Sequence, residues 1–245
     1  EDVFLARCAE QGVAPTLLLP ERLEDAAGEM GEGILRTHPD LSHASYLITK
    51  HPRRLGHPLE LEVTTTRARY PELAALKPSY QAANIACAVC LAENHLGRVL
   101  DAEKLYASIV SCPTPGRFQL LRPDPPILID ACHNPQSVET FLTAVRAIEP
   151  EVENRPTLLA AVLADKDVRG IVALLAREFP HVVCTQTSSH RALPAEELAE
   201  LFRCARADVA GVYPSVRDAV SALCGDSYVA CGSITLAGEV LAQLA

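Results

Sequence analysis

The sequence predicts an α/β fold built around a mainly parallel sheet with helices on both faces. Short, almost continuously apolar runs alternate with helical patterns in the carboxyl-terminal half of the chain. Such runs are typical of parallel strands that are buried on both sides. Apolar residues make up 49% of the 245 residues, which is enough for a substantial core and excludes a disordered chain.

The residues before position 112 predict a smaller segment of helices and strands. Leu59, Leu61 and Val63 alternate with polar residues, as in a half-buried strand, and Gly97 ends a helical pattern. The expected elements are helices over 1–12, 79–96 and 101–110, strands over 16–19, 45–49 and 59–66, and an irregular stretch over 21–43.

The sequence pattern changes at residues 112–116, where two prolines and a glycine end the preceding helix. This change predicts a domain boundary. We therefore expect one domain over residues 1–112 and a second over 113–245. In the second, Pro135 after Asn134 is typical of a capped helix start. The expected strands span 126–130, 157–163, 181–185 and 227–231, and the expected helices begin at positions 135, 168, 194, 216 and 236.

Composition excludes several classes of function. The formal net charge is −9, and no basic face is visible for nucleic acid or an anionic membrane. No run of about 18 apolar residues and no signal peptide occur, so we expect a cytoplasmic protein without membrane contact. The nine scattered Cys favour reduced core thiols, and Cys87-x-x-Cys90 favours core packing over redox or metal chemistry.

Polar residues gather where the expected parallel strands end. In an open parallel sheet, ligands bind beyond the carboxyl ends of the strands. There the sequence places Asp130 and His133, then Lys166, then His190-Arg191, and finally Ser233. Acids, bases and helix starts are therefore expected at one edge of the sheet, and their joint occurrence favours a functional site.

Each of these residues also has a purely structural interpretation. Asp130 and Asn134 fit turn and cap positions, and Asp165-Lys166-Asp167 fits a solvated turn with a cap. Ser233 fits an N-cap, and His190-Arg191 fits an exposed surface pair. Both interpretations remain open for each residue taken alone.

The sequence contains no recognisable phosphate-binding loop. The nearest match to a dinucleotide motif is Gly31-x-Gly33, but position 36 is Arg and no strand precedes it. No G-x-x-x-x-G-K-[ST] motif occurs. If ATP is used, its phosphates must be held by a segment outside this chain.

Short motifs follow one another in a fixed order through the second domain. They are Pro115-Gly116-Arg117-Phe118, Asp130-Ala131-Cys132-His133-Asn134-Pro135, Asp165-Lys166-Asp167, Arg191-Ala192 and Gly232-Ser233. With their spacing over residues 113–245 these motifs resemble the folylpolyglutamate synthase/dihydrofolate synthase family of the Mur ligase group. The resemblance extends back to residues 80–86, which are similar to the helix that ends the family's ATPase domain. Ala131 stands where the family has Gly, and Lys77-Pro78 replaces another Gly.

The resemblance implies that residues 1–112 end an α/β ATPase domain and that 113–245 form a Rossmann-like domain. It also implies an ATP-dependent ligase, which phosphorylates a carboxylate of dihydropteroate or folate and joins L-glutamate to it. The protein would be a monomer acting on small molecules, with no nucleic-acid or membrane partner. Mg²⁺ is expected with ligands upstream of this chain and with none in it.

The resemblance also implies roles for individual residues. Asn84, Arg117 and Asp130 are expected to contact ATP, and Asp130 can either accept from ribose hydroxyls or orient a partner. The expected catalytic residues on the glutamate or folate side are His133, Lys166 and Ser233.

Two other functions remain open. One is another Mur-type amino-acid ligase, for example one that acts on a cell-wall precursor. The other is a non-catalytic nucleotide-binding module of the same fold. The Phe118 context and the His133-Asn134-Pro135 form favour the folate branch. A Gly-rich phosphate loop upstream of Glu1 would identify a ligase, and its absence would favour the binding module.

The chain alone is expected to show no ligase turnover, because it contains no phosphate loop. The measurement is phosphate release from ATP with magnesium, glutamate and either dihydropteroate or tetrahydrofolate. Folate-dependent release well above a no-enzyme control would contradict this expectation.

Overall fold

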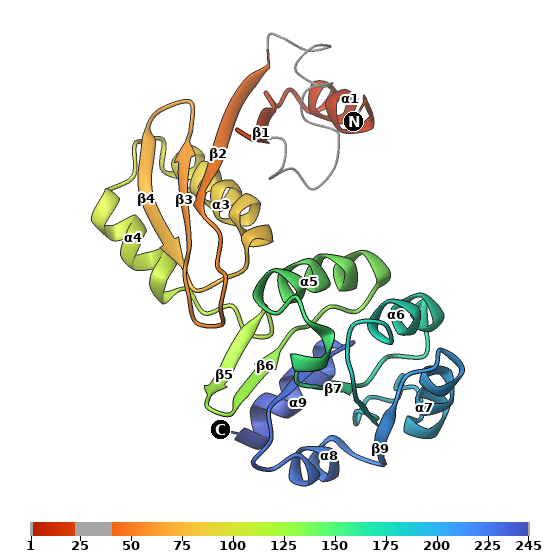
Figure 1. The fold of residues 1–245 in the computed structure, drawn as a ribbon. Coiled ribbons are helices and arrows are strands. Elements are labelled where there is room, and N and C mark those ends of the chain that lie inside the picture. Colours follow the sequence, from red (N-terminus) through yellow and green to blue (C-terminus); the bar gives the residue numbers. More distant parts are fainter. Residues whose placement is uncertain (1, 23–40, 245) are drawn as a thin grey trace. The chain divides into compact units, whose positions relative to one another are not determined.

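The structure is a computed structural model that describes residues 2–22 and 41–244. Its residues form two compact units, each with its own sheet (Figure 1). The first unit comprises Glu1–His51 and Pro58–Cys112, and the second comprises Pro52–His57 and Pro113–Ala245. Most of the irregular stretch expected over 21–43 lies outside the described residues.

The first unit contains a four-stranded sheet in the order β1-β2-β3-β4. β1 pairs in parallel with β2, whereas β3 is antiparallel to both of its neighbours. Leu59, Leu61 and Val63 of β3 are fully buried and belong to one core with residues of α3, as their alternation predicts. The elements are α1 (Asp2–Glu10), β1 (Thr16–Pro20), β2 (Ser42–Lys50), β3 (Leu59–Thr64), β4 (Arg69–Ala75), η2 (Ser79–Gln81), α3 (Ala82–Leu96) and α4 (Ala102–Ser111).

β4 is a strand that the sequence pattern does not predict. Pro71 and Glu72 interrupt its apolar pattern, and Glu72 has a φ of 57°, in the left-handed region. The register between β3 and β4 shifts within the strand. The residues of β4 that are buried are Tyr70, Leu73 and Ala75. Proline and bulges are typical of edge strands, and they interrupt the alternation of apolar and polar residues by which a strand is recognised.

The helices of the first unit end and begin where the sequence predicts. α3 ends at Gly97, whose φ of 68° is accessible to glycine without steric cost. Asp101 caps α4 by accepting a hydrogen bond from the Lys104 N–H at 2.9 Å. The buried Tyr70 hydroxyl donates to Glu93 and accepts from the Leu100 N–H, which ties β4 to α3 and to the turn before α4.

The second unit contains a six-stranded sheet in the order β5-β6-β10-β7-β8-β9. β5 is antiparallel to β6, and the other neighbours are parallel. All residues of β8 and β10 are buried, which confirms the predicted mainly parallel α/β sheet. The strands are β5 (Gln119–Pro123), β6 (Pro126–Ile129), β7 (Thr157–Ala160), β8 (Val182–Thr185), β9 (Val209–Tyr213) and β10 (Tyr228–Cys231).

The sequence pattern misses β5 and β9, which are the two edge strands of this sheet. Neither strand has a fully buried residue. An edge strand packs on fewer neighbours, so its residues form no continuous apolar run. The strand predicted over 157–163 is too long, because β7 ends at Ala160 and Leu163 makes only an isolated bridge to Ala192.

The helices of the second unit cover both faces of its sheet. α5, α6 and α7 lie in a row, and α8 packs against α9 (Figure 1). β6, β7, β8 and β9 follow one another in one direction, so right-handed crossovers put α5 to α7 on one face, and the return to β10 puts α8 on the other. The helices are α5 (Pro135–Ile148), α6 (Val168–Leu175), α7 (Ala195–Cys204), α8 (Val216–Ala222) and α9 (Ile234–Leu244), with η3 (Val152–Asn154) before β7.

Three of these helices begin with the side-chain caps that the sequence predicts. Asn134 accepts from the Ser137 N–H at 2.8 Å, and the Ser137 hydroxyl accepts from the Asn134 N–H in return. Asp167 caps α6 by accepting from the Gly170 N–H at 2.9 Å. Ser215 caps α8 in the same way.

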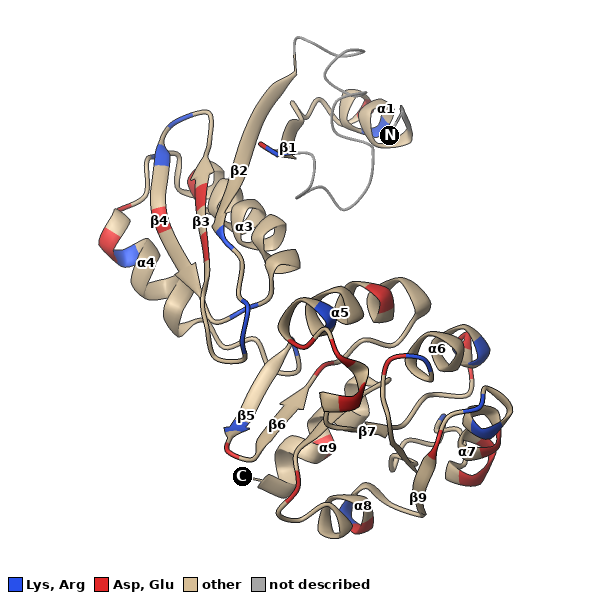
Figure 2. Cartoon of the chain, viewed as in Figure 1, with Lys and Arg blue, Asp and Glu red and all other residues tan. Residues whose placement is uncertain are grey.

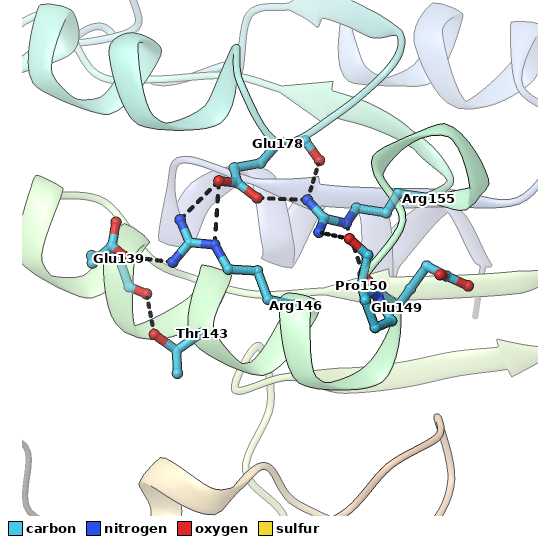
Figure 3. Close-up of polar contacts among 7 residues, drawn as sticks. All are labelled: Glu139, Thr143, Arg146, Glu149, Pro150, Arg155 and Glu178. Carbon is cyan, nitrogen blue, oxygen red and sulfur yellow. Dashed lines mark hydrogen bonds and ion pairs between the residues drawn. The ribbon is translucent and has the colours of Figure 1, made fainter.

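A cluster of arginines and glutamates ties α5 to the segment before β7 and to the segment between α6 and β8 (Figure 3). Arg146 donates to Glu178 at 2.8 Å and to Glu139 at 2.6 Å. The Arg155 side chain is only 2% exposed. It donates to the Glu178 carboxylate at 2.5 Å, to the Glu178 carbonyl, and to two carbonyls just after α5.

The ion pairs also link stability to pH. The hydrogen bond from Arg146 is the main cause that lowers the pKa of Glu178. The stability gained from this ionised carboxylate is therefore fully present above the ordinary pKa of a glutamate, about 4.3. It is lost as the pH falls through the lowered pKa of the folded state.

Arg155→Met is expected to lower the free energy of unfolding by about 3–5 kcal/mol, because buried carbonyls and part of a carboxylate lose their donor. Urea unfolding measures the change. The matched control is Arg203→Met, which removes an exposed pair with Glu200 at 3.6 Å and is expected to cost less than about 0.5 kcal/mol. Equal losses in the two variants would contradict the structural role of Arg155.

Candidate functional site

The loops that follow β6 and β10 are hydrogen-bonded to each other at the carboxyl edge of the sheet. The Asp130 N–H donates to Ala230 O at 3.0 Å, and the Gly232 N–H donates to Cys132 O at 3.1 Å. After β6 the chain enters α5, whereas after β10 it enters α9, which packs on the other face with α8. Neighbouring strands whose connections leave to opposite faces form the crevice in which open α/β sheets bind ligands.

The Pro115-Gly116-Arg117-Phe118 segment forms a turn held against the end of β6. The Arg117 N–H donates to Thr114 O at 3.2 Å, and Gly116 has a φ of 66°. Proline followed by a glycine with positive φ is the pattern of a type II turn. The Ala131 N–H donates to Gly116 O at 2.7 Å. The Arg117 side chain is exposed on this fixed turn.

Asp130 organises this edge through both oxygens of its carboxylate. One oxygen accepts from the Phe118 N–H and the other from the Cys132 N–H, each at 2.8 Å. Asp130 is 4% exposed. Phe118 has a φ of 48°, which is unusual for a residue with a β-carbon, and its ring packs on Phe141 with a centroid distance of 5.8 Å. The carboxylate therefore helps to hold the backbone of the turn.

His133 presents one ring nitrogen to the edge of the sheet. Its Nδ1 lies 2.9 Å from Ala131 O. A carbonyl oxygen can only accept, so Nδ1 carries the proton and Nε2 of the neutral ring is left as an acceptor. His133 is half-buried, and its position beside the capped start of α5 is fixed by a hydrogen bond from its N–H to Ser137.

Ser233 lies at the start of α9 and is fully buried. Its Oγ accepts from the Thr235 N–H at 3.1 Å, so the structural interpretation as an N-cap describes its geometry. The neighbouring Gly232 has a φ of 111°, and a β-carbon there would lie 2.8 Å from Ala161 O. This close approach joins the end of β10 to the segment that follows β7.

Lys166 lies apart from the groups around Asp130. It lines a groove of about 540 Å³ together with Asp167, Arg169, Glu197, Glu200 and Leu201, between the start of α6 and α7. Three of the four charged residues of α7 are glutamates, and Figure 2 marks acidic residues in red. The structure thus brings Arg117, Asp130, His133 and Ser233 onto adjoining loops, whereas the Lys166 groove contains none of them.

The other polar residues of this edge pair with one another. Arg191 forms an exposed ion pair with Asp165, and its hydrogen bond is the main cause that lowers the pKa of Asp165. His190 is exposed. The segment from 186 to 193 returns along the segment after β7, because the Ala164 N–H donates to Arg191 O and the Leu193 N–H donates to Val162 O.

Asn84 belongs to the first unit and stands in the first turn of α3. It is exposed, and its Nδ2 donates to Gln81 Oε1 at 2.9 Å. Of the predicted site residues it is the one that the structure places outside the second unit.

Two residues take part in this edge without having been predicted. Gln119 Oε1 accepts from the Gly116 N–H at 2.9 Å. Glu239 of α9 accepts from both the N–H and the hydroxyl of Ser188, which ties the segment after β8 to α9. A polar residue three positions after a Pro-Gly turn is a usable signal for Gln119. No sequence signal connects Glu239 with Ser188, because the two are 51 positions apart.

The nine cysteines are free thiols, as predicted. Cys132, Cys184 and Cys231 are buried, and burial raises the pKa of Cys184 to about 12. A hydrogen bond with Cys231, followed by burial, raises the pKa of Cys132. Core packing is wrong for Cys87, which is exposed on α3 at a position outside the core of the first unit. It is also wrong for Cys112, Cys204 and Cys224, which are exposed.

Two hydroxyls near this edge are buried with their hydrogen-bonding capacity unsatisfied. The buried hydroxyls of Thr114, before the Arg117 turn, and of Thr187, after β8, have no partner among the described residues. Unpaired buried hydroxyls are costly, and a bound molecule can satisfy them.

Within residues 2–22 and 41–244, no three His, Cys, Asp or Glu side chains gather as metal donors. In the same ranges no helix is long and apolar enough to cross a membrane.

Comparison with known proteins gives consistent matches. Residues 116–234 match the family described as "Mur ligase, glutamate ligase domain". The dihydrofolate synthase/folylpolyglutamate synthase of Mycobacterium tuberculosis is 35% identical over 129 residues, which cover 51% of this chain and 26% of that protein. The Escherichia coli protein of the same name is 28% identical over 104 residues, covering 42% of this chain and 24% of that protein.

A solved structure extends the similarity over both units. Folylpolyglutamate synthase of Mycobacterium tuberculosis complexed with ADP and AMPPCP matches with a TM-score of 0.69 and 26% identity. The match covers 87% of this chain and 52% of that one. The chain therefore spans about half the length of this solved relative.

Gly232→Ala is expected to lower the free energy of unfolding by about 2–4 kcal/mol, because it combines an unfavourable φ with a contact to Ala161 O. The matched control is Gly238→Ala in α9, where nothing lies within 4 Å of the added carbon. That change is expected to raise the free energy by about 0.5–1 kcal/mol. Chemical denaturation distinguishes the two, and a neutral Gly232→Ala would show that the two loops do not pack closely.

Proposed function

We propose that this chain belongs to the folylpolyglutamate synthase/dihydrofolate synthase family of Mur ligases and matches its carboxyl-terminal part. From this premise, the chain serves an ATP-dependent ligase that joins L-glutamate to folate or dihydropteroate. The observation that carries the proposal is the fixed turn at the crevice beside β6, which presents the exposed Arg117. In this proposal residues 113–245 are the glutamate ligase domain, and residues 1–112 end the ATPase domain.

The proposed reaction has two steps. ATP phosphorylates a carboxylate of the folate or dihydropteroate, and the amine of free glutamate then attacks the acyl phosphate and releases phosphate. Neither step needs a covalent enzyme nucleophile. The enzyme has to position the reactants and to neutralise the charge that develops on phosphate oxygens.

Arg117 is the residue that we assign to the nucleotide phosphates. Its guanidinium has several donors in a fixed plane, which suits phosphate oxygens. The main chain on both sides of it is held by hydrogen bonds, so little freedom is lost when a phosphate binds. Asp130 has both oxygens engaged by main-chain N–H groups, which favours the role of orienting the turn. The other role assigned to Asp130 is to accept from a ribose hydroxyl.

His133, Ser233 and Lys166 are assigned to the glutamate or folate side. The free Nε2 of His133 can accept a proton from the incoming ammonium, which must be deprotonated before it attacks. Ser233 sits at the amino end of α9, where the helix dipole favours a carboxylate. Lys166 is assigned to a glutamate carboxylate at the start of α6, in a groove that Arg169 and the acidic Asp167, Glu197 and Glu200 also line. Asn84 is assigned to the nucleotide from the first unit.

The proposal places the magnesium ligands outside this chain. Magnesium would neutralise the charge of the ATP phosphates. The partners are ATP, L-glutamate and folate or dihydropteroate, and the net charge of −9 argues against nucleic acid. We also infer a monomeric protein of the cytoplasm, where free thiols persist.

Arg117→Ala in the complete enzyme that carries this chain is expected to lower the ATP-dependent specificity constant about 30- to 1000-fold. This corresponds to about 2–4 kcal/mol of lost transition-state stabilisation. Steady-state kinetics with ATP and glutamate varied separately measure it, with thermal melting as a folding control. Arg217→Ala, at an exposed position of α8, is the matched control and is expected to be near wild type. Near wild-type kinetics for Arg117→Ala would remove this residue from the site.

A further inference from the structure

Three successive main-chain N–H groups around Arg117 each donate a hydrogen bond. The Gly116 N–H donates to Gln119 Oε1 at 2.9 Å, and the Arg117 N–H donates to Thr114 O at 3.2 Å. The Phe118 N–H donates to the Asp130 carboxylate at 2.8 Å. One of these three acceptors is a main-chain carbonyl, and the other two are side chains that reach the turn from outside it.

Arg117 lies between two residues with positive φ. Gly116 has a φ of 66° and Phe118 a φ of 48°. A β-carbon makes the left-handed region unfavourable, so Phe118 keeps this conformation only because its surroundings fix it. The fixing contacts are the bond to Asp130 and the burial of its ring on Phe141. Strain of this kind in a folded protein points to a function for the residue that it presents.

The Gly116 N–H belongs to the peptide that decides the type of the turn. Type I and type II turns differ mainly in the orientation of the peptide between their two central residues, here Pro115 and Gly116. In a type II turn this N–H usually faces solvent, and nothing within the turn holds it. Gln119 supplies an acceptor for it. A rotation of this peptide would break that bond and take the φ of Gly116, the residue before Arg117, out of the left-handed region.

Gln119 is itself well anchored for this task. It is the first residue of β5 and pairs with Ile129 at the end of β6. Its main chain is therefore part of the sheet, and its half-buried side chain reaches back over Arg117 to the turn.

We propose that Gln119 is a positioning residue that holds the Pro115–Gly116 peptide in its type II orientation and thereby directs Arg117 toward the phosphates of the bound nucleotide. The proposal rests on the proposed function, since it requires a nucleotide at this crevice. Gln119 acts through Arg117 and makes no contact with the reacting groups.

The test compares ADP, which carries phosphates, with adenosine, which carries none, by calorimetric titration of the complete enzyme. Gln119→Leu removes the acceptor at similar size and is expected to weaken ADP binding about 5- to 10-fold while leaving adenosine binding unchanged. Gln119→Glu keeps an acceptor oxygen and is expected to stay within about threefold of wild type. Gln243→Leu, at an exposed position of α9, controls for the added apolar group.

A double-mutant cycle separates positioning from general damage. In the Arg117→Ala background, Gln119→Leu is expected to have no further effect on ADP binding, because the residue through which it acts is gone. Equal weakening of ADP and adenosine, or additive losses in the cycle, would overturn the proposal. A wild-type enzyme that binds neither ligand would overturn the proposed function and the role of Gln119 with it. Binding of ADP that is unchanged in Gln119→Leu would overturn the role of Gln119 alone.

Discussion

The carboxylate of Asp130 accepts hydrogen bonds from the Phe118 and Cys132 N–H groups, and the loops of the candidate site are attached to the segment that these bonds hold. Hydrogen bonds to an ionised acceptor are stronger than neutral ones, which offsets the cost of burying the charge. From this segment Ala131 binds the Arg117 turn, and Cys132 binds the start of the α9 loop. Loss of the carboxylate would therefore loosen two loops at once.

Structural and chemical roles are divided among the polar residues of this edge. Asn134, Asp167 and Ser233 accept from main-chain N–H groups at the starts of helices, so their structural interpretation holds whatever else they do. The residues that the proposed function assigns to ligands include the long or half-exposed side chains of Arg117, His133 and Lys166. A few mobile side chains on rigid elements suit the positioning of reactants better than covalent catalysis.

The sequence predicts strands that have a continuous apolar run or a regular alternation, and it misses three edge strands that have neither. β8 and β10 are buried on both faces and give continuous apolar runs, whereas the edge strands β5, β9 and β4 give none. Helix starts are predictable because a cap is a local event within three residues. The same locality explains why Asn134, Asp167 and Ser215 are found from the sequence alone.

The sequence predicts the residues of the candidate site only to the extent that it predicts where the parallel strands end. The rule for parallel sheets brings Asp130, His133 and Ser233 to one edge. It does not say in which direction a side chain leaves that edge, and Lys166 lies in a groove with α7 because α6 begins directly after it. The bond between Asp130 and Phe118 and the positive φ of Phe118 depend on tertiary contacts that leave no local pattern.

Ala131, which stands where the resemblance leads us to expect a glycine, lies in a crowded part of this edge. A β-carbon at Gly116 would lie 3.3 Å from the Ala237 methyl and 3.5 Å from that of Ala131. The methyl of Ala131 therefore lies close beside Gly116. Ala131 is buried in the same core as Ala237 of α9, so the added methyl also contributes apolar contact. Because the substitution faces the core and leaves the Ala131 N–H bonded to Gly116, it does not disturb the Arg117 turn.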